Sequence, residues 1–304
     1  MLINEIIADI ERLKKERNAI IMAHNYQPAE IQKIADINGD SLELSIRAAN
    51  LPEIDVVVFC SVDFMGETAK LLSPEKIVLL PDAEAFCPMA EMINPDGLRA
   101  LKAQHPGVPV VCYVNSSAAV KAEADICCTS ANAVKIVNSL DADTVIFAPD
   151  RNLGAYVARY TDKKLILWQG YCPVHNRILP EHVIAKKALH PNAKVIVHPE
   201  CLPAVIDIAD YVVSTGGMVK LVKENEAEEF IVGTEEGMMY RLEKEAPAKK
   251  FYHISPIAFC PNMNRTTLEK VRDSLLKMQY PIEVPSEIAE KAKIAIERMI
   301  NLSR

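Results

Sequence analysis

One order of landmarks occurs three times along this 304-residue chain, and this internal repeat constrains the fold more than any other feature. Each copy has a helix-like stretch, then an apolar run rich in β-branched residues, then an Ala-Asp pair. The apolar runs are "NAIIMAHNYQ" at 18–27, "VPVVCYVNSS" at 108–117 and "AKVIVHPECL" at 193–202. The Ala-Asp pairs lie 89 and then 85 residues apart, at Ala35-Asp36, Ala124-Asp125 and Ala209-Asp210. Such self-similarity indicates repeated structural units.

A second apolar run with an acidic turn follows in each copy, as in "VVVFCSVDFMGE", "TVIFAPDRNLG" and "EFIVGTEEGM". Apolar runs that alternate with helix-period segments are typical of βαβ units around a parallel sheet. Because the period is too long for a solenoid, we predict an α/β fold of three similar αβα domains about a pseudo-threefold axis. The domains are expected at 1–88, 89–173 and 174–304, the third with a C-terminal helical extension. The helix-like stretch 285–302 is expected to tie the third domain to the first.

Polar residues follow the first apolar run at matched positions in all three copies. The repeat offsets superpose four sets, which are His24, Tyr113 and His198; Tyr26, Asn115 and Glu200; Asp40, Thr129 and Ser214; and Ser41, Ser130 and Thr215. Because ligands of open α/β units bind at the carboxyl ends of the strands, three such ends around one axis predict a shared central pocket. The hydroxyls of Ser41, Ser130 and Thr215 precede helix-like runs, and helix N-termini bind anions. A single hydroxyl there is more often an ordinary N-cap, but three matched ones favour an anionic ligand.

An aromatic residue followed by Cys-Pro closes each copy, at Phe86-Cys87-Pro88, Tyr171-Cys172-Pro173 and Phe259-Cys260-Pro261. With 8 Cys and 19 Pro in 304 residues, composition alone gives about 0.5 Cys-Pro pairs. Three thiolates at a common point would hold a zinc ion with one further ligand, or a [4Fe-4S] cluster with one open iron. The sequence has no CxxC pair, which argues against a structural zinc ribbon and a ferredoxin-type carrier. Packing as small hydrophobes, which is common for a lone cysteine, does not explain the shared proline.

The other five cysteines are weighed in the same way. Cys60 and Cys112 lie in apolar strand runs and are expected in the core. Cys127-Cys128 is expected to pack, with a secondary redox pair as the alternative. Cys201, in "HPEC", lies close to the predicted pocket and is the strongest rival ligand.

Composition narrows the function classes. Half of the residues are hydrophobic and 25% are charged, as in a folded domain with a buried core. The net charge of −7 gives no support to a nucleic-acid partner, and no apolar run approaches the length of a membrane span. The stretch 3–17 has the spacing of an amphipathic helix and not of a signal peptide. We therefore expect a cytoplasmic protein, whose cysteines serve metal binding, catalysis or packing more often than disulfides.

The sequence resembles the quinolinate synthase family over nearly its whole length. The matching stretches, in order, are "AHNYQ" (23–27), "GDSLELS" (39–45), "VDFMGETAKLL" (62–72), "CPMA" (87–90), "YVNSSAAVKAEAD" (113–125), "CTSANAV" (128–134), "PDRNLG" (149–154), "CPVH" (172–175), "HPEC" (198–201), "STGGM" (214–218), "GTEEGM" (233–238) and "CPNM" (260–263). The resemblance implies a [4Fe-4S] cluster on Cys87, Cys172 and Cys260. Longer members carry a C-terminal CxxCxxC, whereas this chain has only Cys260 there and resembles the short form.

The resemblance also implies a reaction and roles for matched residues. Iminoaspartate would condense with dihydroxyacetone phosphate to give quinolinate, phosphate and two waters, with the open iron as a Lewis acid. The implied proton-transfer residues are Tyr26, Glu200, His198 and His24. The residues implied to orient the intermediate or hold its anionic groups are Tyr113, Asn115, Ser41, Ser130, Ser214 and Thr215. His175 would reach substrate near the cluster, and Asp40 either binds substrate or caps its helix.

Three function hypotheses stay open. The first, which the resemblance implies, is the iron–sulfur enzyme that makes quinolinate for NAD biosynthesis. The second is a zinc hydrolase that uses the same cysteines, with Glu200 as general base. The third is a non-catalytic iron–sulfur sensor that binds a small anion. The expected partners are small anionic substrates, and a transient contact with an iminoaspartate-producing enzyme is left open.

Overall fold

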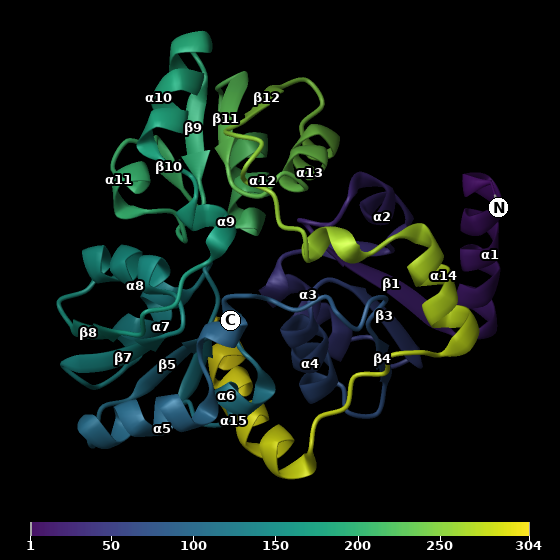
Figure 1. The fold of residues 1–304 in the computed structure, drawn as a ribbon, viewed down its shortest axis with the longest axis horizontal. Coiled ribbons are helices and arrows are strands. Elements are labelled where there is room, and N and C mark those ends of the chain that lie inside the picture. Colours follow the sequence, from purple (N-terminus) through teal and green to yellow (C-terminus); the bar gives the residue numbers. More distant parts are fainter. Residues whose placement is uncertain (1, 304) are drawn as a thin grey trace.

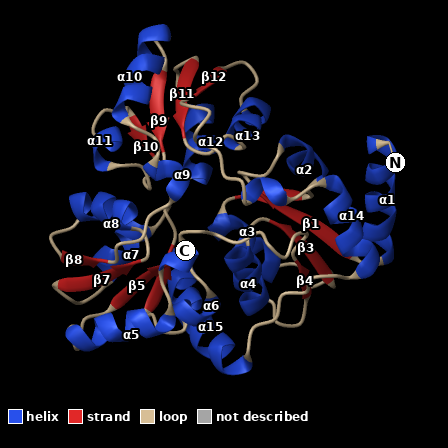
Figure 2. Ribbon diagram, viewed as in Figure 1, coloured by secondary structure: helices blue, strands red, loops and turns tan. Residues whose placement is uncertain are grey.

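Three parallel sheets, each of four strands, form the framework of the protein. The structure is a computed structural model and describes residues 2–303. In Figure 1 the sheets belong to three lobes around a common centre, the first purple to blue, the second blue to teal and the third green. Figure 2 shows helices packed around each set of strands. The predicted α/β class with three αβα domains is confirmed.

The first domain has its strands in the order β2-β1-β3-β4. Its elements are α1 (Ile3–Glu16), β1 (Ala19–His24), α2 (Ala29–Ile34), β2 (Ile37–Gly39), α3 (Ser41–Ala49), β3 (Val56–Cys60), α4 (Asp63–Leu72) and β4 (Ile77–Leu79). The central strands β1 and β3 are almost wholly buried, as is usual for parallel strands covered by helices on both faces. This burial explains why both strands are continuous apolar runs in the sequence.

The second domain repeats this order of elements, and its strands run β6-β5-β7-β8. A short 3₁₀ helix, η1 (Ala90–Met92), leads into it. Its elements are α5 (Pro95–Gln104), β5 (Val110–Tyr113), α6 (Ala118–Lys121), β6 (Ile126–Cys128), α7 (Ala133–Ser139), β7 (Thr144–Ala148), α8 (Arg151–Val157), η2 (Ala158–Tyr160) and β8 (Lys164–Leu167). The helix α5 begins with Asn94 as N-cap and Pro95 at its first position, which is a favoured combination.

The third domain again has the same order, with strands β10-β9-β11-β12. Its elements are α9 (Pro173–Asn176), α10 (Pro180–Leu189), β9 (Lys194–Val197), α11 (Pro203–Ile206), β10 (Tyr211–Val212), α12 (Thr215–Glu224), β11 (Glu229–Gly233), α13 (Met238–Glu245), β12 (Lys250–His253) and η3 (Met263–Arg265). One apolar cluster contains residues of both the third and the first sheet, including Phe230 and Phe59. These two domains therefore share a packed interface.

The recurring Ala-Asp pairs have a structural role that is the same in each domain. Each aspartate accepts a 2.8 Å hydrogen bond from a backbone N–H of the first strand, and the three pairs are Asp36 with Ile21, Asp125 with Val110, and Asp210 with Val195. The carboxylate thus ties the start of the second strand to the first. This explains why the pair recurs although it lies far from the carboxyl ends of the strands.

Two helices after the third sheet pack on the other two domains. The helix α14 (Leu268–Lys277) lies along α1, with Leu275 in the apolar cluster of the first domain. The helix α15 (Ser286–Ser303) packs mainly on α6 and β6, and Ile296 joins the core of the second domain (Figure 1). The prediction that 285–302 ties the third domain to the first is therefore wrong, because α14 meets the apolar stripe of α1 before the chain reaches the second domain. Within residues 2–303, no helix combines the length and apolar character needed to cross a membrane.

Candidate active site

The carboxyl ends of the three sheets face one central cavity. The empty space in it measures about 740 Å³ including its open mouth. The residues predicted from the sequence that line it are His24, Tyr26, Asp40, Ser41, Cys87, Tyr113, Asn115, Ser130, Cys172, His175, His198, Glu200, Thr215 and Cys260. Ser214 is the one predicted site residue that is not among the described lining residues. Val62, Phe64 and Met65 give one wall an apolar surface.

The alternative that Asp40 caps its helix is confirmed, whereas the hydroxyl caps expected at Ser41 and Thr215 are displaced by one residue. In the second domain α7 begins only at Ala133, with Asn132 and not Ser130 as its N-cap residue. Asp40 caps α3 by accepting from the Glu43 N–H at 2.9 Å, and Ser214 caps α12 by accepting from the Gly217 N–H at 3.2 Å. Ser41 and Thr215 are instead the first residues inside these helices. The cap residues are Asp40 and Ser214, one position earlier, because a cap residue has extended backbone angles and precedes the first helical residue. Asp40 also lines the cavity, so capping does not remove it from the site.

Two histidines at the ends of first strands have the same local geometry. The Tyr26 N–H donates to His24 Nδ1 at 3.1 Å, and the Glu200 N–H donates to His198 Nδ1 at 3.3 Å. Each imidazole therefore has its Nε2 free to carry the proton. In His198 this atom lies 3.2 Å from the Ser130 hydroxyl of the second domain. The repeat thus places two imidazoles at equivalent points of the cavity wall.

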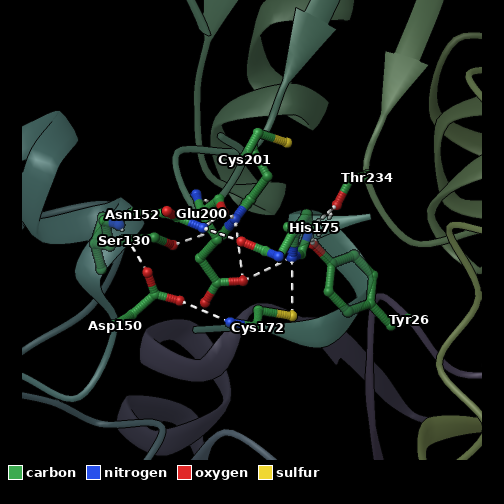
Figure 3. A network of polar contacts seen from close by, with 12 residues as sticks. Tyr26, Ser130, Asp150, Asn152, Cys172, His175, Glu200, Cys201 and Thr234 are labelled. Atoms are coloured by element: carbon green, nitrogen blue, oxygen red, sulfur yellow. Dashed lines mark hydrogen bonds and ion pairs between the residues drawn. The ribbon is translucent and has the colours of Figure 1, made fainter. Parts of the chain in front are cut away.

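A chain of hydrogen bonds connects Tyr26 to Glu200 through two residues (Figure 3). The Tyr26 hydroxyl contacts Thr234 Oγ1, and that oxygen lies 2.8 Å from His175 Nε2. On the other side of the ring, His175 Nδ1 lies 2.8 Å from Glu200 Oε2 and 3.1 Å from Cys172 Sγ. All donors are satisfied when the tyrosine donates to the threonine, the threonine to the imidazole, and the imidazole to the carboxylate. The chain joins the first and third domains beside a cysteine.

Burial shifts the pKa values of this network. It raises the pKa of Tyr26 and Tyr113 well above the usual value, and the Glu200 carboxylate adds to both shifts. It lowers the pKa of His24 to about 3, so this imidazole is neutral at physiological pH. Burial alone would raise the pKa of Glu200, but His198 and His175 lower it by more, and the result is well below the usual value. Glu200 is therefore an ionised carboxylate beside neutral phenols.

Three cavity atoms have no hydrogen-bond partner among the described residues. They are Glu200 Oε1, Asn115 Oδ1 and Thr129 Oγ1. Buried polar atoms are nearly always paired in folded proteins, so unpaired ones that face a cavity indicate that a polar ligand or water completes them. The cavity is thus shaped for a ligand with donor groups.

One cysteine from each Cys-Pro triplet reaches the cavity. Cys87, Cys172 and Cys260 are partly exposed and form no disulfide, and all three line the cavity. Burial is the main cause that raises the pKa of Cys87 to about 12, and Cys260 contributes to the rise. Burial also raises the pKa of Cys172 well above its usual value, with contributions from Glu200 and Cys87. Bound metal would have to displace the three protons, which is how thiolate sites form.

The other five cysteines are fully buried. Cys201, the rival ligand, has its sulfur 3.5 Å from the Gly233 carbonyl and points away from Cys172 in Figure 3. Cys127 is the register neighbour of Cys112 on adjacent strands, and Cys128 is buried beside it. These positions agree with packing for Cys127-Cys128.

Sequence reasoning missed three buried residues at this site. Thr234, Asp150 and Glu235 follow the third strand of their domains, β7 or β11, and are at most 1% exposed. Thr234 bridges Tyr26 and His175, whereas the two acids accept from backbone N–H groups of cysteines. The acidic turn that recurs after the second apolar run of each copy is the sequence signal that points to these acids.

The fold and the site define a class of protein, an α/β enzyme with three equivalent domains around a cysteine-lined acid–base cavity. The family model described as Quinolinate synthetase A protein matches residues 8–301 of the chain. The chain is 56% identical over 294 residues to a quinolinate synthase of Methanoregula boonei, with 97% of each chain covered. It is 58% identical over 293 residues to a quinolinate synthase of Dehalococcoides mccartyi strain CBDB1, covering 96% of this chain and 97% of the relative. The chain belongs to the quinolinate synthase family.

Proposed function

We propose that the central cavity condenses iminoaspartate with dihydroxyacetone phosphate to quinolinate, as a step of NAD biosynthesis. Four carbons of the imine and three of the triose make the seven of the product, and one phosphate and two waters leave. The observation that supports this is the meeting of acid–base side chains and three cysteines from three domains in a chain of this family. Iminoaspartate would come from a separate enzyme, and a transient contact with that enzyme stays a prediction.

The cofactor proposed for the cavity is a [4Fe-4S] cluster held by Cys87, Cys172 and Cys260. The donor set fits, because three unpaired thiols of three domains line one cavity and leave one iron without a protein thiolate. When bound, the cluster would supply a Lewis-acidic iron for a hydroxyl or carboxylate of the substrate. A substrate beside the cluster would donate hydrogen bonds to Glu200 Oε1 and Asn115 Oδ1, which have no partner among the described residues.

Anionic substrates would be held without cationic side chains, since no Lys or Arg is among the described lining residues. The starts of α3 and α12 face the cavity through Ser41 and Thr215, and helix N-termini attract phosphate and carboxylate groups. Neutral His24 and the His198–Ser130 pair add hydrogen-bond donors. Such a site binds anions through oriented dipoles, and it leaves no fixed positive charge to hold the product.

Proton transfer would run through the chain from Tyr26 to Glu200. Glu200, ionised and with one oxygen unpaired, is the proposed acceptor of a substrate proton. Tyr26, a neutral phenol, is the proposed donor to a leaving hydroxyl. Thr234 and His175 connect these two groups, so a proton given up by one end can be replaced from the other.

The test is anaerobic purification followed by metal analysis and an activity assay. We expect a brown protein with about four irons and four sulfides per chain, as a cubane requires, and quinolinate from the two substrates. Cys172→Ser is expected to lose the cluster, whereas Cys201→Ser keeps it. A protein with full iron content but no quinolinate formation would instead support the sensor hypothesis.

A zinc enzyme is the second candidate because one observation favours it. Donor atoms of Cys172, His175 and Glu200 lie within 4.8 Å of one another, which is a set of ligands that zinc accepts. This hypothesis predicts a colourless protein with about one zinc per chain. That result would overturn the cluster assignment while leaving the family membership unchanged.

A further inference from the structure

The three cysteine loops are attached to their domains by the same backbone hydrogen bond. Just after β3, β7 and β11, the third strand of each domain, one N–H donates to the carbonyl that lies two residues before the cysteine. The three bonds are Asp63 to Ala85 at 2.8 Å, Arg151 to Gly170 at 2.8 Å, and Glu236 to Ala258 at 3.0 Å. This common bond defines which residues of the three turns are equivalent.

The residue before each of these donors is where the domains differ. It is Asp150 in the second domain and Glu235 in the third, and both accept from the backbone N–H of a cysteine. Asp150 Oδ2 accepts from Cys172 at 3.1 Å, and Glu235 Oε1 accepts from Cys260 at 3.0 Å. In the first domain the equivalent residue is Val62, which cannot accept. The neighbouring Asp63 takes that role instead, because a hydrogen bond from the Cys87 backbone acts on its carboxyl group and lowers its pKa against the effect of burial.

Each of the two carboxyl groups also holds its own turn. The second oxygen of Asp150 accepts from the Leu153 N–H at 2.8 Å. The second oxygen of Glu235 accepts from the Gly237 N–H at 2.6 Å. The side chains of Asp150 and Glu235 are 0% and 1% exposed, so water cannot replace a lost partner. Moving the Cys172 loop would therefore take the Cys172 N–H away from a buried oxygen of Asp150, which is costly. Glu235 Oε1 also accepts from Asn264 Nδ2 at 3.2 Å, so moving Cys260 costs it one of two donors.

We propose that Asp150 and Glu235 are positioning residues that hold Cys172 and Cys260 in place before metal arrives. The proposal rests on the proposed function only in taking these cysteines as ligands. Outer residues that orient ligands in this way commonly decide metal affinity.

The first test measures the reactivity of each thiol in the metal-free full chain. The variants are Asp150→Asn and Glu235→Gln, whose amide groups turn one N–H toward a backbone N–H donor. Labelling with iodoacetamide is followed for each cysteine by peptide mass spectrometry. We expect roughly tenfold faster labelling of Cys172 in the first variant and of Cys260 in the second, from the loss of one buried hydrogen bond. Glu235→Asp, which keeps the carboxylate, is expected to restore part of the protection of Cys260.

The matched control is Asp125→Asn. It removes the same kind of bond, a 2.8 Å acceptor for the Val110 N–H, at the opposite end of a strand. It should lower overall stability without changing the relative rates of Cys172 and Cys260. Wild-type rates in both test variants, or equal acceleration of all cysteines as in a globally destabilised chain, would overturn the proposal.

The second test uses the metal-loaded protein. Iron release to a chelator is timed for wild type and for the Asp150, Glu235 and Asp125 variants at equal iron content. We expect faster release in the first two variants only, and equal rates in all four proteins would contradict the positioning role. A protein that holds no iron would refute the proposed cofactor, but the labelling pattern of the metal-free chain would still test this inference.

Discussion

Thr234 gives the sharpest test of the hydrogen-bond chain. Thr234→Val keeps the shape of a wholly buried side chain but removes the hydroxyl between Tyr26 and His175. The lost bond to His175 Nε2 is 2.8 Å long, and typical bonds contribute about 0.5–1.5 kcal/mol, with about 1–3 kcal/mol for a buried group left unpaired. The Tyr26 hydroxyl already lies 3.4 Å from His175 Nε2, so these two groups can form a direct hydrogen bond that recovers part of the lost free energy.

We therefore expect Thr234→Val to lose about 1–3 kcal/mol of folding free energy and to show roughly 10- to 100-fold lower kcat. Stability is followed by circular dichroism of the metal-free chain during thermal unfolding, and activity as quinolinate formation by the loaded enzyme. The fall in kcat should exceed the fall that partial unfolding would cause, because the folded fraction of the variant stays near unity at the assay temperature.

The matched control for this prediction is Thr266→Val. Thr266 is 1% exposed, and its hydroxyl has no partner among the described residues. It does not line the cavity, so this change should leave stability and kcat nearly unaltered. If Thr234→Val behaved like Thr266→Val in both measurements, the hydrogen-bond chain would have no role in folding or in proton transfer.

Two further predictions concern the contacts between domains. Gly237→Ala places a methyl carbon 2.5 Å from the Tyr26 carbonyl oxygen, and because backbone cannot yield easily we expect a loss of about 1–3 kcal/mol in thermal unfolding. A wild-type midpoint would show that the two domains can separate slightly. For Asp82, burial raises the pKa, but Lys270 and Arg265 lower it by more, to below 3.8. A lowered pKa stabilises the folded chain above pH 3.8, and this is lost as the pH falls through the folded value. Asp82→Asn should flatten the acid limb of the midpoint–pH curve, and an unchanged curve would contradict this.

The strands and helices of the three domains could be predicted because their signals are local. An apolar run such as 193–202 contains its own strand, and α1 coincides with the predicted helix-like stretch 3–17 within one residue. The repeat then multiplied the evidence, since each element was seen three times. The common cavity followed from the topology of parallel sheets, which brings the carboxyl ends of strands to one edge.

Features that depend on distant partners could not be predicted in this way. The helix α15 packs on the second domain because its apolar face completes that core, and no local pattern names the partner. Thr234 was missed because a lone threonine after a strand resembles any other, and only its contacts with Tyr26 and His175 distinguish it. The cap of α3 stayed open between Asp40 and Ser41 because both are good cap residues by type, and the backbone angles decide for Asp40.

The repeat also explains why positions were easier to find than roles. Equivalent residues around a threefold axis would present the same group three times, but the proposed substrates have no such symmetry. A site for them must therefore differ among the copies, as at Tyr26, Asn115 and Glu200, which are superposed by the offsets but are chemically unlike. Val62 and Asp150 show the same divergence beside the cysteines. Matched places where the three copies carry different polar residues are thus where the chemistry of this scaffold is expected, and the identical Ala-Asp pairs are where it is not.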